Sequence, residues 1–97
     1  MPLVHIPSIP QKLMLAGHTT HYLDNISVAI ILLEKTGIKN GDTLVIEGDN
    51  CIFTQPVDEM QIDRNPVTKA KKGSHVGLKV AFAASVNGKV YKLSKNY

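Results

Sequence analysis

Short runs of alternating apolar and polar residues follow one another along this chain, separated by glycine, asparagine and aspartate. A period of two is typical of β-strands that bury one face. In Thr43–Glu47 the apolar residues Leu44 and Ile46 fall on one face, and His75–Val80 repeats the pattern. Further runs of this kind are His18–Leu23, Cys51–Val57, Asp58–Ile62 and Val90–Leu93. The pattern predicts about six or seven short strands.

The segment Ile26–Leu33 is nearly continuous in apolar residues, and four of its eight residues are β-branched. Its length and its β-branched residues favour a buried central strand. A helix is the alternative, because alanine and leucine tolerate one and the run could continue through Glu34 and Lys35 to a stop at Gly37. The strand is the preferred interpretation.

Turn residues separate the predicted strands. Gly48–Asn50 predicts a tight turn, Asn87–Gly88 a hairpin turn with positive torsion, and Val67–Ala70 a possible single helical turn. Pro56 requires a sheet edge or a bulge in the bent strand pair around it. The candidate core residues of that pair are Phe53, Val57, Met60 and Ile62. Because closure removes sheet edges that invite aggregation, the predicted fold is all-β, a small closed antiparallel β-barrel.

Three prolines, Pro2, Pro7 and Pro10, give the first residues an extended or irregular backbone. Residues 1–16 are therefore predicted to form a partly irregular N-terminal arm, and residues 17–97 a single β-barrel domain. A length of 97 residues with 43% hydrophobic and 20% charged residues fits one folded domain and leaves no room for a second, catalytic one.

Composition also limits where the protein works. Apolar runs reach only about eight residues, short of the roughly 20 that a membrane helix needs. The N-terminus has neither a basic segment nor a long apolar one, so we expect no signal peptide and a cytoplasmic location. Cys51 is the only cysteine, which excludes an internal disulfide framework and a thiolate cluster for metal.

The net charge of +3 hides a strong asymmetry. Residues 1–63 carry three lysines and all eight acidic residues, a net charge of −5, whereas residues 64–97 carry eight basic residues and no acid, a net charge of +8. Such a distribution can present a basic face to a phosphate backbone or an acidic partner. Strands far apart in sequence interleave in a small barrel, so a solvated surface without one contiguous patch is the alternative.

Several motifs resemble, in order and spacing, the second domain of translational GTPases such as elongation factor Tu. The resemblance covers residues 17–93 and is greatest to stand-alone elongation-factor-like proteins that consist of this β-barrel. The motifs are Gly17–Tyr22, Ile26–Leu33, Lys39–Ile46, Phe53–Ile62, Val67–Ala70 and Gly73–Val80. The closing hairpin around Asn87 and the proline-rich arm depart from the family pattern.

The motif glycines have expected structural roles. Gly41 permits the torsion that ends a loop, and Asp42 accepts backbone donors in the turn. Ala70 is small enough to lie beneath a strand crossing, Gly73 turns the chain back, and Gly77 allows a neighbouring backbone to come close.

The sequence nominates no active site. It contains neither a phosphate-binding loop nor a base-reading motif, so we expect no GTP binding, no nucleotide cofactor and no enzyme activity. His18 and His21 are three residues apart and fall on opposite faces of a strand, which argues against a metal site. Cys51 is expected to have a semi-buried packing role rather than a catalytic one.

Basic residues after position 63 are the candidate binding residues, and they are Arg64, Lys69, Lys71, Lys72, Lys79, Lys89 and Lys92. Aromatic residues amount to 5%, so RNA contact would rest on phosphate and shape more than on base stacking. The resemblance implies RNA or ribosome contact in translation. We therefore expect a binding module for RNA or a ribonucleoprotein. The alternative is a protein interaction module without RNA contact, through docking on a larger partner or self-association.

Overall fold

The computed structural model describes residues 11–95, and these residues form an all-β domain. None of them is helical, so this part of the chain holds no helix able to cross a membrane. The helical turn predicted at Val67–Ala70 was wrong, because Val67 ends one short strand, Lys69 and Ala70 form another, and Thr68 bends the chain between them. The strands are β1 (Gln11–Leu23), β2 (Val28–Leu33), β3 (Ile38–Lys39), β4 (Thr43–Gly48), β5 (Cys51–Pro56), β6 (Met60–Ile62), β7 (Asn65–Val67), β8 (Lys69–Ala70), β9 (His75–Lys79) and β10 (Lys89–Lys95).

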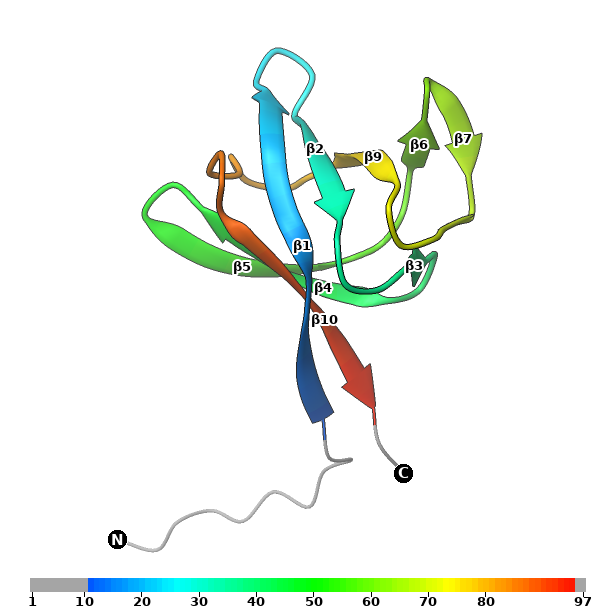
Figure 1. Ribbon diagram of the computed structural model, residues 1–97. Helices are drawn as coiled ribbons and strands as arrows, with labels where there is room; N and C mark the ends of the chain where they lie inside the picture. Colours follow the sequence, from blue (N-terminus) through cyan, green and yellow to red (C-terminus); the bar gives the residue numbers. More distant parts are fainter. Residues whose placement is uncertain (1–10, 96–97) are drawn as a thin grey trace, which may run out of the picture.

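Eight strands form one antiparallel sheet in the order β5-β4-β10-β1-β2-β9-β6-β7, and β3 pairs with β8 in a second, two-stranded sheet. The large sheet curls around the core, and the first part of β1 projects from the body together with the end of β10 (Figure 1). The sheet keeps β5 and β7 as edges, so the closed barrel predicted from the sequence is not what the structure shows.

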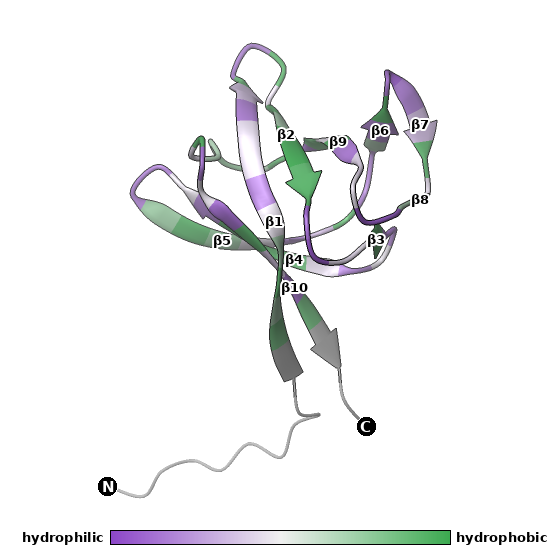
Figure 2. Cartoon of the chain, in the orientation of Figure 1, coloured by the Kyte–Doolittle hydropathy of each residue, from purple (hydrophilic) through white to green (hydrophobic). Residues whose placement is uncertain are grey.

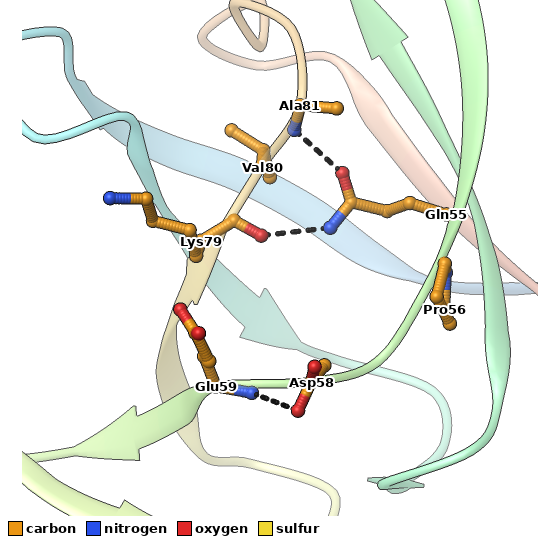
Figure 3. Close-up of a pocket in the computed structure, with 7 residues that line it drawn as sticks. All are labelled: Gln55, Pro56, Asp58, Glu59, Lys79, Val80 and Ala81. Atoms are coloured by element: carbon orange, nitrogen blue, oxygen red, sulfur yellow. Dashed lines mark hydrogen bonds between the residues drawn. The ribbon is translucent and has the colours of Figure 1, made fainter.

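A gap remains between β5 and the chain that follows β9, for a local reason. Pro56 ends β5 without a backbone donor, and Glu59 turns the chain with a φ of 51°. The next strand, β6, then pairs with β9 and β7. The Gln55 side chain spans the gap: its Nε2 donates to Lys79 O at 2.8 Å, and Ala81 N donates to its Oε1 at 2.9 Å (Figure 3). A side-chain amide thus replaces a backbone ladder at this seam.

The core follows the predicted alternation. In β2, Ala29, Ile31 and Leu33 are fully buried, and the strand lies between β1 and β9. The strand interpretation of this segment is confirmed, and the helix alternative is excluded. Leu44 and Ile46 of β4 are also fully buried. The remaining apolar core residues include Phe53, Val57, Met60, Val76, Leu78, Val80 and Val90, with Ile62 partly buried against them.

Strand β1 begins before the predicted domain boundary. Residues 11–16 belong to the sheet because Gln11–Leu15 pair with β10, so the irregular arm predicted for residues 1–16 does not extend that far; residues 1–10 lie outside the described part. The register of β1 shifts between Leu15 and Gly17, and again between Thr19 and His21. A Cβ on Gly17 would overlap the backbone of Leu32, so the first bulge requires glycine.

The turn at Asn87–Gly88 differs from the prediction. Asn87 has a φ of 69°, and Gly88 N donates to Ser85 O at 2.9 Å, so a tight turn is present. The strand that follows, β10, pairs with β1 and β4 and not with β9. The turn therefore redirects the chain across the sheet and does not close a hairpin.

Candidate functional site

Two lysines face each other in the small sheet. Lys39 of β3 and Lys69 of β8 are partners in register, and both are exposed. Partners in an antiparallel pair project from the same side of a sheet, at a Cβ separation of about 5 Å. Like charges placed in this way destabilise the pair by roughly 0.2–1 kcal/mol. The fold therefore tolerates a concentration of positive charge here.

The turn after β8 adds two more exposed lysines, Lys71 and Lys72. Gly73 has a φ of +94°, and its N donates to Leu33 O at 2.6 Å. Ser74 closes the turn, because its N donates to Lys71 O at 3.1 Å while its O accepts from Leu33 N at 2.9 Å. The end of β2 thus fastens the lysine-bearing turn to the body.

Lys35 belongs to the connection between β2 and β3, which contacts the backbone at Lys71. Its N donates to Ala16 O at 2.9 Å, and it lies two residues before Gly37. A Cβ on Gly37 would lie 3.2 Å from the Cα of Lys71, so the two backbones are in contact. Counting charges along the sequence missed this group, because the pairing of β3 with β8 brings lysines from both parts of the chain together. We call the group Lys35, Lys39, Lys69, Lys71 and Lys72 the lysine cluster.

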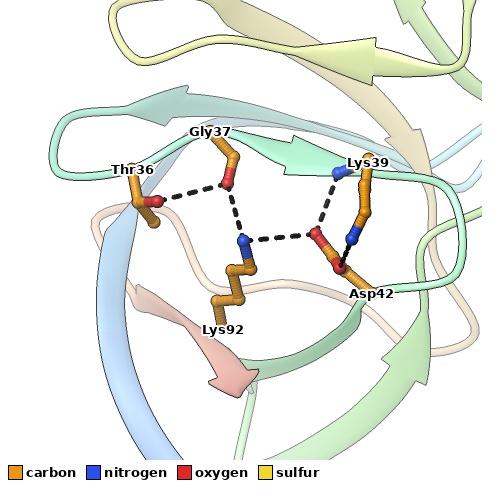
Figure 4. A network of polar contacts seen from close by, with 5 residues as sticks. All are labelled: Thr36, Gly37, Lys39, Asp42 and Lys92. Atoms are coloured by element: carbon orange, nitrogen blue, oxygen red, sulfur yellow. Dashed lines mark hydrogen bonds and ion pairs between the residues drawn. The ribbon is translucent and has the colours of Figure 1, made fainter. Parts of the chain in front are cut away.

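The acidic residues beside the cluster are already engaged. Asp42 Oδ2 accepts from Lys39 N at 2.9 Å, and Oδ1 lies 3.2 Å from Lys39 Nζ (Figure 4). Burial raises the pKa of Asp42, but these hydrogen bonds and the charges of Lys92 and Lys39 outweigh it and hold that pKa below its ordinary value. Glu34 Oε1 lies 2.7 Å from His18 Nδ1.

Lys92, one of the predicted binding residues, makes contacts within the domain. It is the register partner of Leu44, and its side chain is only 23% exposed. Its Nζ donates to Gly37 O at 3.3 Å and lies 3.5 Å from Asp42 Oδ2 (Figure 4). The Lys92 ammonium thus bonds to the β2–β3 connection.

The seven predicted binding residues do not form one face. Lys69, Lys71 and Lys72 come together in the lysine cluster. Arg64 lies at the tip of the β6–β7 hairpin, Lys79 ends β9, and Lys89 begins β10. Strands β1 and β2 lie between β10, which carries Lys89, and β9, so the run of basic residues in the sequence is divided among different parts of the sheet.

The motif turn residues are placed as follows. Gly41 has a φ of +95°, and Asp42 caps the same turn through Lys39 N. Gly77 differs from its prediction: a Cβ there would make ordinary contacts at 3.4 Å with Val28 Cγ1 and 3.6 Å with Ile30 Cδ1, and no backbone atom lies closer than 3.9 Å. The missing side chain leaves open space on the sheet instead of admitting a neighbouring backbone.

That space is part of a groove of about 420 Å³ on the outer face of β2, β9 and β6. Val28 and Ile30 of β2 line it beside Gly77, and the tips of the β1–β2 and β6–β7 hairpins flank it. We call this the outer groove. Its lining residues are Leu23, Ile26, Val28, Ile30, Gln61, Asp63, Arg64, His75 and Gly77.

The candidate chemical residues are dispersed. His18 bonds to Glu34, and His21 Nδ1 lies 3.1 Å from Thr20 Oγ1. Within residues 11–95, no three His, Cys, Asp or Glu side chains gather as a metal site would require. Cys51 is exposed in the β4–β5 hairpin, so its predicted semi-buried packing role was wrong.

Comparison with known proteins identifies a related fold. No family model and no curated protein matches this sequence. A solved structure, the C-terminal domain of a Geobacillus thermoleovorans "putative U32 peptidase", matches with a TM-score of 0.71 at 19% identity and covers 78% of this chain and 95% of its own. At this identity the likeness shows the fold alone. It is a likeness to a domain of that protein and not to a translation factor, so the resemblance predicted from the sequence was wrong.

Proposed function

We propose that this domain is a non-catalytic binding module that holds RNA by its sugar-phosphate backbone, through the lysine cluster. The observation that carries the proposal is the pairing of Lys39 with Lys69, which brings lysines from both parts of the chain to one end of the domain. Phosphates bound across the cluster would offset its positive charge and release counterions. Asp42 already has a cationic partner in Lys39, and Glu34 is hydrogen-bonded to His18, so both compete little.

The expected RNA contact has little sequence preference. The cluster contains lysines and no aromatic residue, so it offers charge without a stacking platform. Lysine ammonium groups contact phosphate as point charges and read no base edge. Three or four phosphate contacts on a single strand predict a slope of log K against log salt of roughly −2 to −3.

The test is fluorescence anisotropy with a labelled oligouridylate at several salt concentrations. The double variant K71E/K72E should lose about tenfold or more in affinity and show a shallower salt slope. The matched control K79E/K89E has the same net charge but alters lysines outside the cluster, and it should stay within about threefold of the unaltered protein. Equal losses in both variants would show that net charge alone attracts RNA. Equal displacement by polyglutamate would point to an acidic protein instead.

A second candidate function, self-association, is favoured by the projecting part of β1. Leu13, Met14 and Leu15 are consecutive and are 52%, 41% and 37% exposed. These residues pair with β10 on one side, whereas β2 joins β1 only from Gly17 onward. The hydrophobic colouring of this ribbon is visible in Figure 2. A free, apolar strand edge is a template for pairing with another strand.

Light scattering over about 10 µM to about 1 mM protein tests this candidate. The unaltered protein should form dimers within this range, and L13K/L15K should remain monomeric. The control V86K alters a side chain that is also 52% exposed but lies outside the projecting part of β1, and it should dimerise as the unaltered protein does. A monomer throughout the range would rule this function out.

A further inference from the structure

One wall of the outer groove is formed by aliphatic side chains. Val28 and Ile30 are half-buried at its base. At the tip of the β1–β2 hairpin, Leu23 and Ile26 are 41% and 49% exposed, although a turn of this kind is usually polar. Gly77 contributes no side chain and leaves the base of the groove open above them. Large aliphatic side chains gathered in a concavity indicate a site for an aliphatic group.

The opposite wall is polar and has unused bonding capacity. Gln61, Arg64 and His75 line it, and among the residues that the structure describes none of these side chains has a hydrogen-bond or ion-pair partner. The lining holds one acid, Asp63, and one cation, Arg64. The Arg64 guanidinium, which has no ion-pair partner among the described residues, can donate two parallel hydrogen bonds to a carboxylate.

The cation on this wall is held at a conformational cost. Asp63 and Arg64 form the two-residue turn between Ile62 and Asn65, with φ values of 51° and 67°. A left-handed conformation costs a residue other than glycine roughly 1–2 kcal/mol, and glycine is the usual residue at the second position of such a turn. A strained arginine beside an open concavity is a reason to look for a binding role.

We propose that the outer groove binds an extended peptide of a partner protein, with a leucine or isoleucine side chain over Gly77 and a carboxylate two residues along paired with Arg64. Residues two apart on an extended chain project to the same side, so both groups can enter the groove together. The volume of about 420 Å³ is within the range of known ligand sites. The lining contains no Phe, Tyr or Trp, so the groove offers no large aromatic platform for a nucleobase.

This site is independent of the lysine cluster. The groove is built from β2, β6, β9 and two hairpin tips, whereas the cluster is built from β3, β8 and their connections. The K71E/K72E variant should lose RNA binding and keep peptide binding. Substitutions in the groove should reduce peptide binding and leave RNA binding unchanged. The two proposals can therefore fail separately.

The test is a titration of ¹⁵N-labelled full-length protein followed by amide chemical shifts. The probe is acetyl-Leu-Ala-Glu-amide, and the matched probes are acetyl-Leu-Ala-Gln-amide and acetyl-Ala-Ala-Glu-amide. We expect the first probe to shift the amides of Val28, Ile30, Arg64 and Gly77, with the matched probes binding at least about fivefold more weakly, about 1 kcal/mol each. AMP serves as a nucleotide probe. Stronger shifts at these amides with AMP, or equal binding of all three peptides, would overturn the proposal.

Variants separate binding from folding. R64G removes the guanidinium and relieves the strained torsion, so it should fold at least as well and lose about fivefold or more in affinity for the glutamate probe only. R64K keeps the charge and should retain most of the affinity. G77V fills the base of the groove and should abolish binding of both leucine probes. Unchanged binding in R64G and G77V would show that the peptide lies elsewhere.

Discussion

Replacing the carboxamide of Gln55 tests whether its two hydrogen bonds stabilise this sheet. The carboxamide supplies a donor to Lys79 O and an acceptor to Ala81 N, at 2.8 and 2.9 Å, where a neighbouring strand would otherwise supply peptide groups. Replacing Gln55 with alanine removes both bonds and leaves the two backbone groups without that partner. The free energy of unfolding should fall, while the fold is retained.

The magnitude follows from the number of bonds and their exposure. Each hydrogen bond contributes about 0.5–1.5 kcal/mol net, so two contribute roughly 1–3 kcal/mol. Lys79 and Ala81 are exposed, and water can replace part of what is lost. We therefore expect about 1–2 kcal/mol, or a fall in Tm of roughly 4–16 °C for a domain of this size.

A charged variant adds a signature in pH. In Q55E the carboxylate still accepts from Ala81 N but faces Lys79 O, and Asp58 and Glu59 lie beside it (Figure 3). Its pKa should rise in the folded state above the unfolded value of about 4.3, because only the protonated form donates to Lys79 O. The stabilising contribution of the protonated form is therefore complete below about pH 4 and is lost as pH rises through the folded-state pKa.

The assay is urea unfolding followed by far-ultraviolet circular dichroism. Measurements on the unaltered protein, Q55A and Q55E at pH 7 and pH 4 give the differences directly, and Q61A serves as the control because Gln61 is exposed and should change stability by less than about 0.5 kcal/mol. If Q55A and Q61A have the same free energy of unfolding, the hydrogen bonds of Gln55 contribute nothing to stability. If the deficit of Q55E does not shrink at pH 4, the carbonyl contact is not the cause.

Three further predictions concern stability and use the same unfolding assay. D42N should cost about 1 kcal/mol at pH 7; because the folded-state pKa of Asp42 is lowered, this deficit should disappear as pH falls below about 4, and a constant deficit would contradict it. G17A should cost more than about 2 kcal/mol, since its Cβ overlaps Leu32, whereas G77A should be nearly neutral. T19V should gain about 1 kcal/mol, because Thr19 Oγ1 is buried without a described hydrogen-bond partner; a loss would indicate an undetected bond.

Local alternation was sufficient to predict much of the fold. The β-branched run Ile26–Leu33 and the alternating run Thr43–Glu47 predicted two strands and their buried faces, because side chains two apart share one side of a strand. The same rule applied to β10 would have placed Lys92 on the side of Val90, whose side chain is fully buried. Because Lys92 is charged, it was assigned to the surface although the alternation placed it on the buried side of β10.

Long-range features were beyond this reasoning. The two register shifts in β1 depend on how neighbouring strands meet, and no local pattern around Gly17 marks them. The prediction of a closed barrel was wrong because Pro56 ends β5 without a backbone donor, and the Gln55 side chain, not a paired strand, bonds to Lys79 O and Ala81 N. The turn at Asp63–Arg64 lacks the glycine that usually reveals it, so the outer groove had no signal in the sequence.

Lys39 and Lys69 are register partners, so the repulsion between them, reduced by the contact of Lys39 with Asp42, makes the smallest sheet of this domain sensitive to the surrounding electrolyte. That sheet has two residue pairs, and the adjoining bond from Asn40 N to Thr68 O measures 2.8 Å. Dilute buffer lengthens the reach of the repulsion, and concentrated salt shortens it. A bound polyanion would act as a splint across the two strands, so that occupancy and local order rise together.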